Sequence, residues 1–248
     1  MSEILIRGDM MISPFVLKMI EHLPKGIVAY FGKSIFNRYI KKYTNISVEG
    51  MENIKDVKRP VIFICNHMSN SDGLIVEKVL KKEDITFVAG IKLGTTALTN
   101  LGLAVSRTIS IKPNTADKEA IKKVINTLKN GKNIFIFPEG TRSRTGGMIE
   151  AKKGVILFQR MAKVPVIPIG MTGTENFLPI NDNDMGAEKF SYADIHVNFG
   201  APIYYDELPP KNDDEDKHSY EKRLTDYLMY KIAELLPKKY RGFYDKEV

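Results

Sequence analysis

The sequence predicts an α/β fold in which helices flank a largely parallel central sheet, preceded by an N-terminal amphipathic two-helix hairpin. Two observations predict the sheet. From residue 46 onward, short runs rich in Val, Ile and Phe alternate with longer stretches of helical periodicity. The runs are apolar at nearly every position, which is typical of strands that helices cover on both faces. A chain of 248 residues is long enough for one sizeable domain of this kind plus a small appendage.

The predicted hairpin occupies residues 1–43, and the α/β domain occupies residues 44–248. Apolar residues recur every three or four positions from 11 to 23, are interrupted by Pro24-Lys25-Gly26, and recur again from 27 to 40. The hairpin carries seven Lys and Arg against three Asp and Glu, a net charge of +4. Helices of this kind either pack on the main domain or lie at the surface of an anionic membrane.

The remaining elements follow from the apolar runs and from the helical periodicity between them. Strands are predicted over residues 46–48, 61–65, 85–89, 104–106, 133–137, 165–169 and 195–199. Helices are predicted over residues 73–81, 115–130, 153–162 and 220–236. The polar segments 181–188 and 211–217, the second of which contains four consecutive acidic residues, are expected to be exposed loops.

Composition limits the class of protein and of partner. The formal net charge of +7 suits an anionic partner. A phosphorylated substrate, an anionic membrane and nucleic acid all fit this charge. The single cysteine, Cys65, excludes an intramolecular disulfide and fits a reducing compartment. The opening residues do not have the pattern of a signal peptide, and no run approaches the ~20 apolar residues that span a bilayer. We therefore expect any membrane contact to be made from the surface.

A first candidate site follows the predicted strand 61–65, in the segment Asn66-His67-Met68-Ser69-Asn70-Ser71-Asp72. Functional residues of open α/β sheets gather at the carboxyl ends of strands. A carboxylate beside an imidazole fixes its tautomer and stabilises the imidazolium, so that the other ring nitrogen is a competent general base. Two further roles stay open from this pattern alone: Asp72 as the cap of the next helix, and His67 as a structural hydrogen-bonding residue.

A second candidate site is the heptapeptide Phe137-Pro138-Glu139-Gly140-Thr141-Arg142-Ser143, again directly after a predicted strand. By itself it is typical of a turn followed by a solvated arginine. Together, the two segments resemble the lysophosphatidate/glycerolipid acyltransferase family, whose hallmarks are His-x-x-x-x-Asp and Phe-Pro-Glu-Gly-Thr-Arg-Ser.

Two further family blocks occur in the expected order. Gly102-Leu103-Ala104-Val105-Ser106-Arg107 resembles the second block, and Val164-Pro165-Val166-Ile167-Pro168-Ile169 resembles the fourth. Lys153-Gly154 lies where family members carry a Lys-Gly pair, so the resemblance spans about residues 46–205. The chain departs from the family pattern at Ser106, at residues 90–94 and at Glu150-Ala151. These departures surround the acceptor region and leave the identity of the acceptor open.

The resemblance implies transfer of a fatty acyl group from a thioester to the free hydroxyl of lysophosphatidate, giving phosphatidate in phospholipid biosynthesis. His67 is then the general base, Asp72 orients it, and Gly140 contributes to the binding of the oxyanion. The expected binding residues for the acceptor phosphate are the cations Arg107, Arg142 and Lys153, together with Glu139, which holds Arg142 or an acceptor hydroxyl. We expect no cofactor and, because no Cys/His cluster with metal spacing occurs, no catalytic metal. The co-substrate is a thioester of coenzyme A or of acyl carrier protein, and Cys65 is expected to be a buried apolar residue.

Because acceptor and product reside in the bilayer, the resemblance favours docking of the hairpin on an anionic membrane surface over simple packing. The protein is expected at the cytoplasmic face, peripheral or monotopic, with five docking residues: Phe15, Lys18, Phe31, Lys33 and Phe36. An alternative is the same reaction on another acceptor, such as glycerol 3-phosphate, another lysophospholipid or a non-phosphorylated alcohol. A non-catalytic lipid-binding protein is a further alternative. No recognised nucleic-acid motif and no Gly-x-Ser-x-Gly hydrolase motif occurs, so we expect no nucleic-acid partner.

Overall fold

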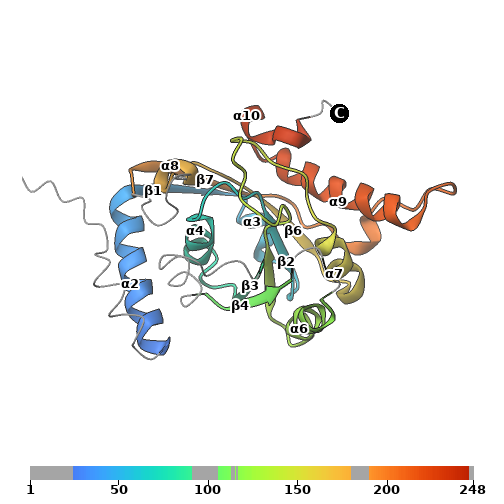
Figure 1. The fold of residues 1–248 in the computed structure, drawn as a ribbon, viewed down its shortest axis with the longest axis horizontal. Helices are drawn as coiled ribbons and strands as arrows, with labels where there is room; N and C mark the ends of the chain where they lie inside the picture. Colours follow the sequence, from blue (N-terminus) through green and yellow to red (C-terminus); the bar gives the residue numbers. More distant parts are fainter. Residues whose placement is uncertain (1–24, 91–105, 113–114, 116, 180–189, 246–248) are drawn as a thin grey trace, which may run out of the picture.

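The structure is a computed structural model that describes residues 25–90, 106–112, 115, 117–179 and 190–245. The described residues form a seven-stranded sheet with the strand order β1-β7-β6-β2-β5-β3-β4 (Figure 1). The strands are β1 (Thr44–Glu49), β2 (Ile62–Cys65), β3 (Ile85–Gly90), β4 (Thr108–Ile111), β5 (Asn133–Ile136), β6 (Val166–Thr172) and β7 (Ala193–Phe199). All neighbouring pairs are parallel except β6 and β7, which are antiparallel. The predicted α/β class with a largely parallel sheet is confirmed, whereas the first helix of the predicted hairpin lies outside the described residues.

Helices connect the strands and cover the sheet. They are α2 (Lys25–Tyr43), α3 (Glu52–Lys55), α4 (Asp72–Val79), α6 (Lys118–Lys129), α7 (Gly154–Ala162), α8 (Thr174–Phe177), α9 (Lys217–Ala233) and α10 (Lys238–Arg241), with the short 3-10 helices η1 (Tyr205–Glu207) and η2 (Gly242–Tyr244). Figure 1 shows α2 and α4 on one side of the sheet and α6, α7 and α9 on the other. Within the described residues, no helix has the length and apolar character needed to cross a bilayer.

The central strand β2 is apolar throughout because both of its faces are covered. Ile62 and Ile64 point into the core beneath α6, α7 and α9. Phe63 and Cys65 point the other way, into the core shared with α2 and α4. All four side chains are fully buried, so this strand has no solvent face that would require a polar residue. The continuous apolar run that predicted a parallel strand is therefore explained by burial of the strand on both faces.

The structure corrects part of the prediction for the N-terminal segment. Phe36, predicted to dock on a membrane, is only 3% exposed and packs with Ile40 into the core on the α4 side of the sheet. Lys33 is paired with Glu77 of α4 at 2.9 Å. This face of α2 is therefore used for packing on the domain, which leaves Phe36 unavailable to a membrane. Of the other predicted docking residues, Phe15 and Lys18 lie outside the described part of the chain, and Phe31 lies in α2 with a side chain that is not described.

The sequence does not predict the edge strand β4 at its observed position. Of the strand expected over 104–106, only Ser106 is described, and it is not part of a strand, whereas β4 begins at Thr108. β4 is an edge strand that pairs only with β3, and it reads Thr-Ile-Ser-Ile, with alternating polar and apolar residues. Edge strands need not be apolar at every position, so a search for continuous apolar runs overlooks them. The loop expected over 181–188 lies outside the described residues.

Candidate active site

Two loops meet at the carboxyl edge of the sheet. One follows β2 and the other follows β5, which is its parallel neighbour in the register Ile64↔Ile136. The loops contact each other directly, because the Ser143 N–H donates to the His67 carbonyl at 2.8 Å. Asn66 ties the first loop to β6: its side chain donates to the Met171 carbonyl and accepts from the Met171 N–H, both at 2.8 Å. The sheet thus brings the two sequence motifs together, as their positions after strands predict.

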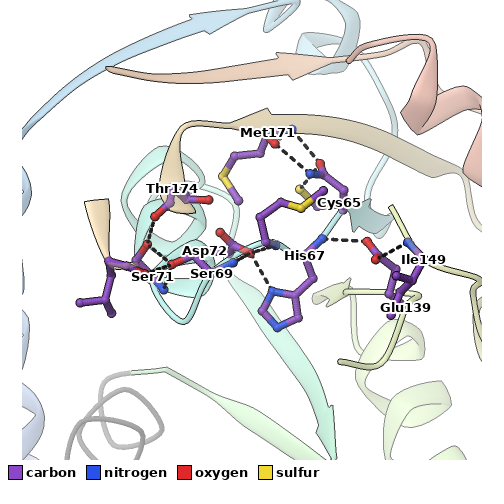
Figure 2. A network of polar contacts seen from close by, with 12 residues as sticks. Cys65, His67, Ser69, Ser71, Asp72, Glu139, Ile149, Met171 and Thr174 are labelled. Carbon is purple, nitrogen blue, oxygen red and sulfur yellow. Dashed lines mark hydrogen bonds and ion pairs between the residues drawn. The ribbon is translucent and has the colours of Figure 1, made fainter. Parts of the chain in front are cut away.

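His67 and Asp72 form a pair in this site (Figure 2). Nδ1 of His67 lies 2.7 Å from Oδ2 of Asp72, which is fully buried at the start of α4. The same oxygen accepts the backbone N–H groups of Met68 at 2.7 Å and Ser69 at 2.9 Å. An ionised carboxylate only accepts, so Nδ1 carries the proton and Nε2 presents a lone pair. The side chain of His67 is 18% exposed, which leaves the ring accessible to a substrate.

The loop between these two residues is held by α8. Oγ of Ser69 donates to the Leu178 carbonyl at 2.9 Å, and Oγ of Ser71 donates to the Thr174 carbonyl at 3.2 Å. Both serines are buried, and both carbonyls belong to α8 or to the residue that ends it. These contacts fix the path of the turn that brings Asp72 back to His67. The sequence contains no signal for them, because their partners are more than 100 positions away.

Phe137 contacts His67 and also lines an apolar cavity. The Phe137 ring stacks on the imidazole with a centroid distance of 4.1 Å and an interplanar angle of 14°. Phe137 also lines a cavity of about 360 Å³. The other apolar lining side chains are Val88, Ile111, Ile136, Pro138, Val155 and Phe158, and the lysines in the lining are Lys112, Lys152 and Lys153. An apolar cavity with cationic residues beside a general base is suited to an amphiphile that carries an anionic group.

Glu139 holds two backbone N–H groups of the site. Its side chain is 1% exposed, and its two oxygens accept the backbone N–H groups of His67 and Ile149, each at 2.9 Å. Burial is the main cause that raises the pKa of this carboxyl to about 7. Both oxygens of Glu139 thus hold the protein backbone, which is a role that the sequence does not predict, and its predicted role toward the acceptor stays a prediction. Glu139 joins the loop after β2 to the segment around residue 149.

The N–H of Gly140 is also committed. It donates to the Phe137 carbonyl at 3.0 Å and closes a turn. This N–H is therefore used within the turn, and the predicted contribution of Gly140 to oxyanion binding stays a prediction. Gly140 has φ +71°, a conformation that residues with a side chain rarely adopt. We conclude that glycine is needed here to shape the turn that carries Glu139.

The predicted basic ligands occupy different parts of the molecule. Arg107 precedes β4 at its amino end and pairs with Asp84, whereas His67 follows the carboxyl end of β2. The structure thus does not bring Arg107 to the cluster, and its predicted contact with the acceptor phosphate is corrected. Arg142 lies half-buried in the loop after β5. Lys153 precedes α7, lines the cavity and donates from Nζ to the His218 carbonyl at 2.8 Å.

Cys65 is fully buried in β2 and points away from the cavity, toward the core on the α4 side of the sheet. Burial is the main cause that raises the pKa of its thiol well above the usual range, which disfavours the nucleophilic thiolate. Among the described residues, no group of three or more His, Cys, Asp and Glu side chains is arranged to hold a metal ion.

Comparison with known proteins identifies the family. The profile of the Acyltransferase family matches residues 45–172, which is more than half of the chain. The chain belongs to this family. A chloroplastic 1-acyl-sn-glycerol-3-phosphate acyltransferase of Brassica napus is 26% identical over 77% of this chain and 54% of its own. A probable 1-acyl-sn-glycerol-3-phosphate acyltransferase of Mycoplasma genitalium is 28% identical over 62% of each chain. The acyltransferase chain thus spans between about half and two thirds of the length of these curated relatives.

A solved structure resembles the acyltransferase fold. The crystal structure of the 1-acyl-sn-glycerophosphate (LPA) acyltransferase PlsC of Thermotoga maritima matches with a TM-score of 0.58 and 24% identity. The match covers 89% of this chain and 80% of that one, and it confirms the fold. The family profile includes both loops of the site and ends at β6, so α9 and the C-terminal segment of this acyltransferase lie outside it.

The unusual environment of Glu139 predicts a pH-dependent effect on the stability of the protein. A carboxyl whose pKa rises from 4.5 to about 7 on folding stabilises the protein below pH 4.5. This stabilisation is at most about 3 kcal/mol, and it is lost as the pH rises through 7. We therefore expect wild type to lose more free energy of unfolding than Glu139→Gln over this range. At pH 5 the variant should be less stable by about 1–3 kcal/mol, because its amide nitrogen faces a backbone N–H.

Chemical denaturation at a series of pH values measures this difference. Glu150→Gln is the matched control, because Glu150 is an exposed carboxylate of the same segment whose pKa Lys222 lowers. Its stability profile should run parallel to that of wild type between pH 4.5 and 7. A profile of Glu139→Gln that also runs parallel to wild type would contradict the buried, proton-binding state of this carboxyl.

Proposed function

We propose that this acyltransferase transfers a fatty acyl group from an acyl thioester to the free hydroxyl of lysophosphatidate, giving phosphatidate. The observation that carries the proposal is the His67–Asp72 pair, 2.7 Å apart, beside an apolar cavity whose lining includes lysines. The curated relatives are named as 1-acyl-sn-glycerol-3-phosphate acyltransferases, which supports this acceptor. The thioester is that of coenzyme A or of acyl carrier protein.

In the proposed mechanism, His67 acts as general base. Nε2 accepts the proton of the acceptor hydroxyl while the hydroxyl oxygen forms a bond to the thioester carbonyl carbon. Asp72 stabilises the imidazolium that results. The carbon–sulfur bond then breaks, and the thiolate takes the proton from the imidazolium and leaves as a thiol. The nucleophile belongs to the acceptor, so no residue of the enzyme becomes acylated, which agrees with the burial of Cys65.

The acceptor phosphate is proposed to bind between Arg142 and Lys153. Arg142 lies one residue before Ser143, which contacts the backbone of His67 at 2.8 Å. Lys153 lines the cavity on the α7 side. A phosphate held by two cations would leave the acyl chain of the acceptor or donor to occupy the apolar part of the cavity. Fixing the phosphate in this way positions the acceptor hydroxyl for deprotonation.

We further propose that the protein reaches its acceptor from an anionic membrane surface. The last turns of α2 carry three exposed basic residues, Arg38, Lys41 and Lys42. Basic residues near an anionic leaflet contribute about 1 kcal/mol each to binding. Lys33 contributes less to this attraction because its charge is paired with Glu77.

Initial rates with a set of acceptors and both classes of donor test the proposal. We expect turnover of lysophosphatidate, with phosphatidate identified by mass spectrometry. Glycerol 3-phosphate and other lysophospholipids should be poorer acceptors. The rate should also be higher when lysophosphatidate is presented in vesicles containing anionic phospholipid than in neutral vesicles. If another acceptor is turned over faster, that acceptor takes the place of lysophosphatidate in the proposed reaction. If no acyl transfer is detected, a non-catalytic lipid-binding protein is favoured instead.

A further inference from the structure

The C-terminal segment, which lies outside the matched family region, packs back onto the segment that follows the second loop of the site. The N–H of Met148 donates to the Tyr240 carbonyl, and the N–H of Phe243 donates to the Met148 carbonyl, both at 2.8 Å. Tyr240 is 8% exposed and Met148 is 1% exposed, so this contact is part of the core. Segments that are about 90 residues apart in the sequence are thus joined by paired backbone hydrogen bonds.

Two glycines allow this close approach. A Cβ atom on Gly242, which has φ +50°, would lie 2.3 Å from the Met148 carbonyl oxygen. A Cβ atom on Gly147 would lie 2.8 Å from the Cα atom of Gly242. Both distances are shorter than a van der Waals contact, so the two backbones touch at a place where no side chain fits. The C-terminal segment therefore has a single close-packed position on Met148.

The backbone next to Met148 is connected to His67 through Glu139. The next residue, Ile149, donates its N–H to Oε2 of Glu139, and Oε1 of Glu139 accepts the N–H of His67. Figure 2 shows Glu139 between these two backbone groups. The carbonyl of Tyr240 thus supports His67 through a short series of contacts in which each member is buried or half-buried.

The side chain of Tyr240 makes a second, independent connection to the site. Its hydroxyl donates to Oε1 of Glu175 in α8 at 2.6 Å. Burial and the neighbouring carboxylate raise the pKa of this hydroxyl, so the phenol stays protonated as a donor. The other oxygen, Oε2 of Glu175, is buried without a hydrogen-bond partner among the described residues. α8 in turn holds Ser69 and Ser71, the two serines of the turn between His67 and Asp72.

We propose that Tyr240 is a positioning residue that sets the His67–Asp72 geometry by linking its two supports. One support reaches the backbone of His67 through Met148 and Glu139, and the other reaches the turn before Asp72 through Glu175. If either support shifts alone, the 2.7 Å contact between His67 and Asp72 changes. Displacements of this kind affect the rate of the chemical step more than the binding of the substrates. For catalysis, this inference rests on the proposed acyl transfer.

Tyr240→Phe tests the proposal, because it removes only the hydroxyl and keeps the buried ring. With lysophosphatidate as acceptor, we expect kcat to fall about ten-fold, while KM for either substrate stays within about two-fold. Tyr220→Phe is the matched control. The hydroxyl of Tyr220 donates to the Pro209 carbonyl at 3.1 Å, and neither residue contacts Glu139, Glu175 or the turn between His67 and Asp72 through this hydrogen bond. The control should lose a similar amount of thermal stability with kcat unchanged. Glu175→Gln combined with Tyr240→Phe should lower kcat no further than Tyr240→Phe alone.

A readout without turnover separates this proposal from the proposed function. In protein labelled with ¹⁵N-histidine, the ring signals of His67 should shift in Tyr240→Phe and stay unchanged in Tyr220→Phe. The signals of His196, which lies on β7, should not move in either variant. If wild type is active and Tyr240→Phe keeps both its kcat and its His67 signals, the positioning role is excluded. If wild type transfers no acyl group, the proposed reaction fails, and the His67 signals alone decide whether Tyr240 positions the pair.

Discussion

Replacing His67 by Ala is expected to lower kcat by about 10³-fold, within the range that general-base catalysis typically supplies. A neutral hydroxyl is a poor nucleophile, and Nε2 of His67 is the accessible lone pair beside the cavity. No described side chain replaces it, because Cys65 is buried and protonated and Glu139 is occupied by two backbone N–H groups. The rate is measured as release of thiol from the acyl thioester in the presence of lysophosphatidate. KM for the acceptor should change little, because the proposed phosphate ligands are intact.

His196→Ala serves as the control for loss of an imidazole. His196 lies on β7 and contacts Oγ of Ser47 at 2.6 Å, away from the two loops. This variant should keep wild-type kcat. His67→Ala removes the stacking on Phe137 and the hydrogen bond to Asp72, but it keeps the backbone contacts of both loops. We therefore expect both variants to fold, and the melting temperature checks this. Substantial turnover by His67→Ala would place the base elsewhere and reject the mechanism.

Asp72→Asn is expected to lower kcat by about 10²–10³-fold while the protein still folds. In the wild type, the N–H groups of Met68 and Ser69 donate to Oδ2 of Asp72. In the variant, the amide oxygen of the asparagine can accept the same two N–H groups. The lost property is the negative charge beside Nδ1 of His67, which fixes the tautomer and stabilises the imidazolium. The charge matters more in the transition state than in the ground state, because the imidazolium exists only after the proton is accepted. Steady-state kinetics should therefore show the loss in kcat.

Asp117→Asn is the matched structural control. Asp117 precedes α6 and, like Asp72, accepts two backbone N–H groups, those of Lys112 and Ala120, each at 3.0 Å. Each substitution removes one negative charge from a carboxylate that accepts two backbone N–H groups near the start of a helix, but only Asp72 faces an imidazole. Both should lower the melting temperature, and only Asp72→Asn should lower kcat. Equal rates for the two variants would show that the carboxylate of Asp72 has a structural role alone.

Most of the fold is predictable from the sequence because its signals are local. Strands β2 and β5 are covered on both faces, so β2 is apolar throughout and β5 is apolar after Asn133, and both runs are recognisable without knowledge of the neighbouring strands. The turn from β2 into α4 is equally local, because Asp72 lies five residues from His67 and the contact is closed within one loop. The sequences of the two loops resemble the acyltransferase family, and the match to the family profile confirms that the chain belongs to it.

The edge of the sheet and the N-terminal segment are less predictable because their signals depend on what lies beside them. β4 has one neighbouring strand, so its alternating residues do not stand out. The amphipathic pattern of α2 fits a membrane surface and a protein surface equally well. Only the packing of Phe36 and Ile40 against the α4 side of the sheet distinguishes the two for these residues. Periodicity shows that a helix has an apolar face, and the tertiary structure determines what covers it.

The sequence by itself determined the α/β class, the positions of the two loops after strands, and His67 and Asp72 as a pair. Only the tertiary structure decided that Glu139 holds the backbone of His67, that the N–H of Gly140 closes a turn, and that Arg107 lies at the opposite end of its strand. It also connected Tyr240 to the site through partners 65 to about 90 positions away. The physical reason is that a residue's type limits which bonds it can make, whereas its partner depends on segments that meet only after folding.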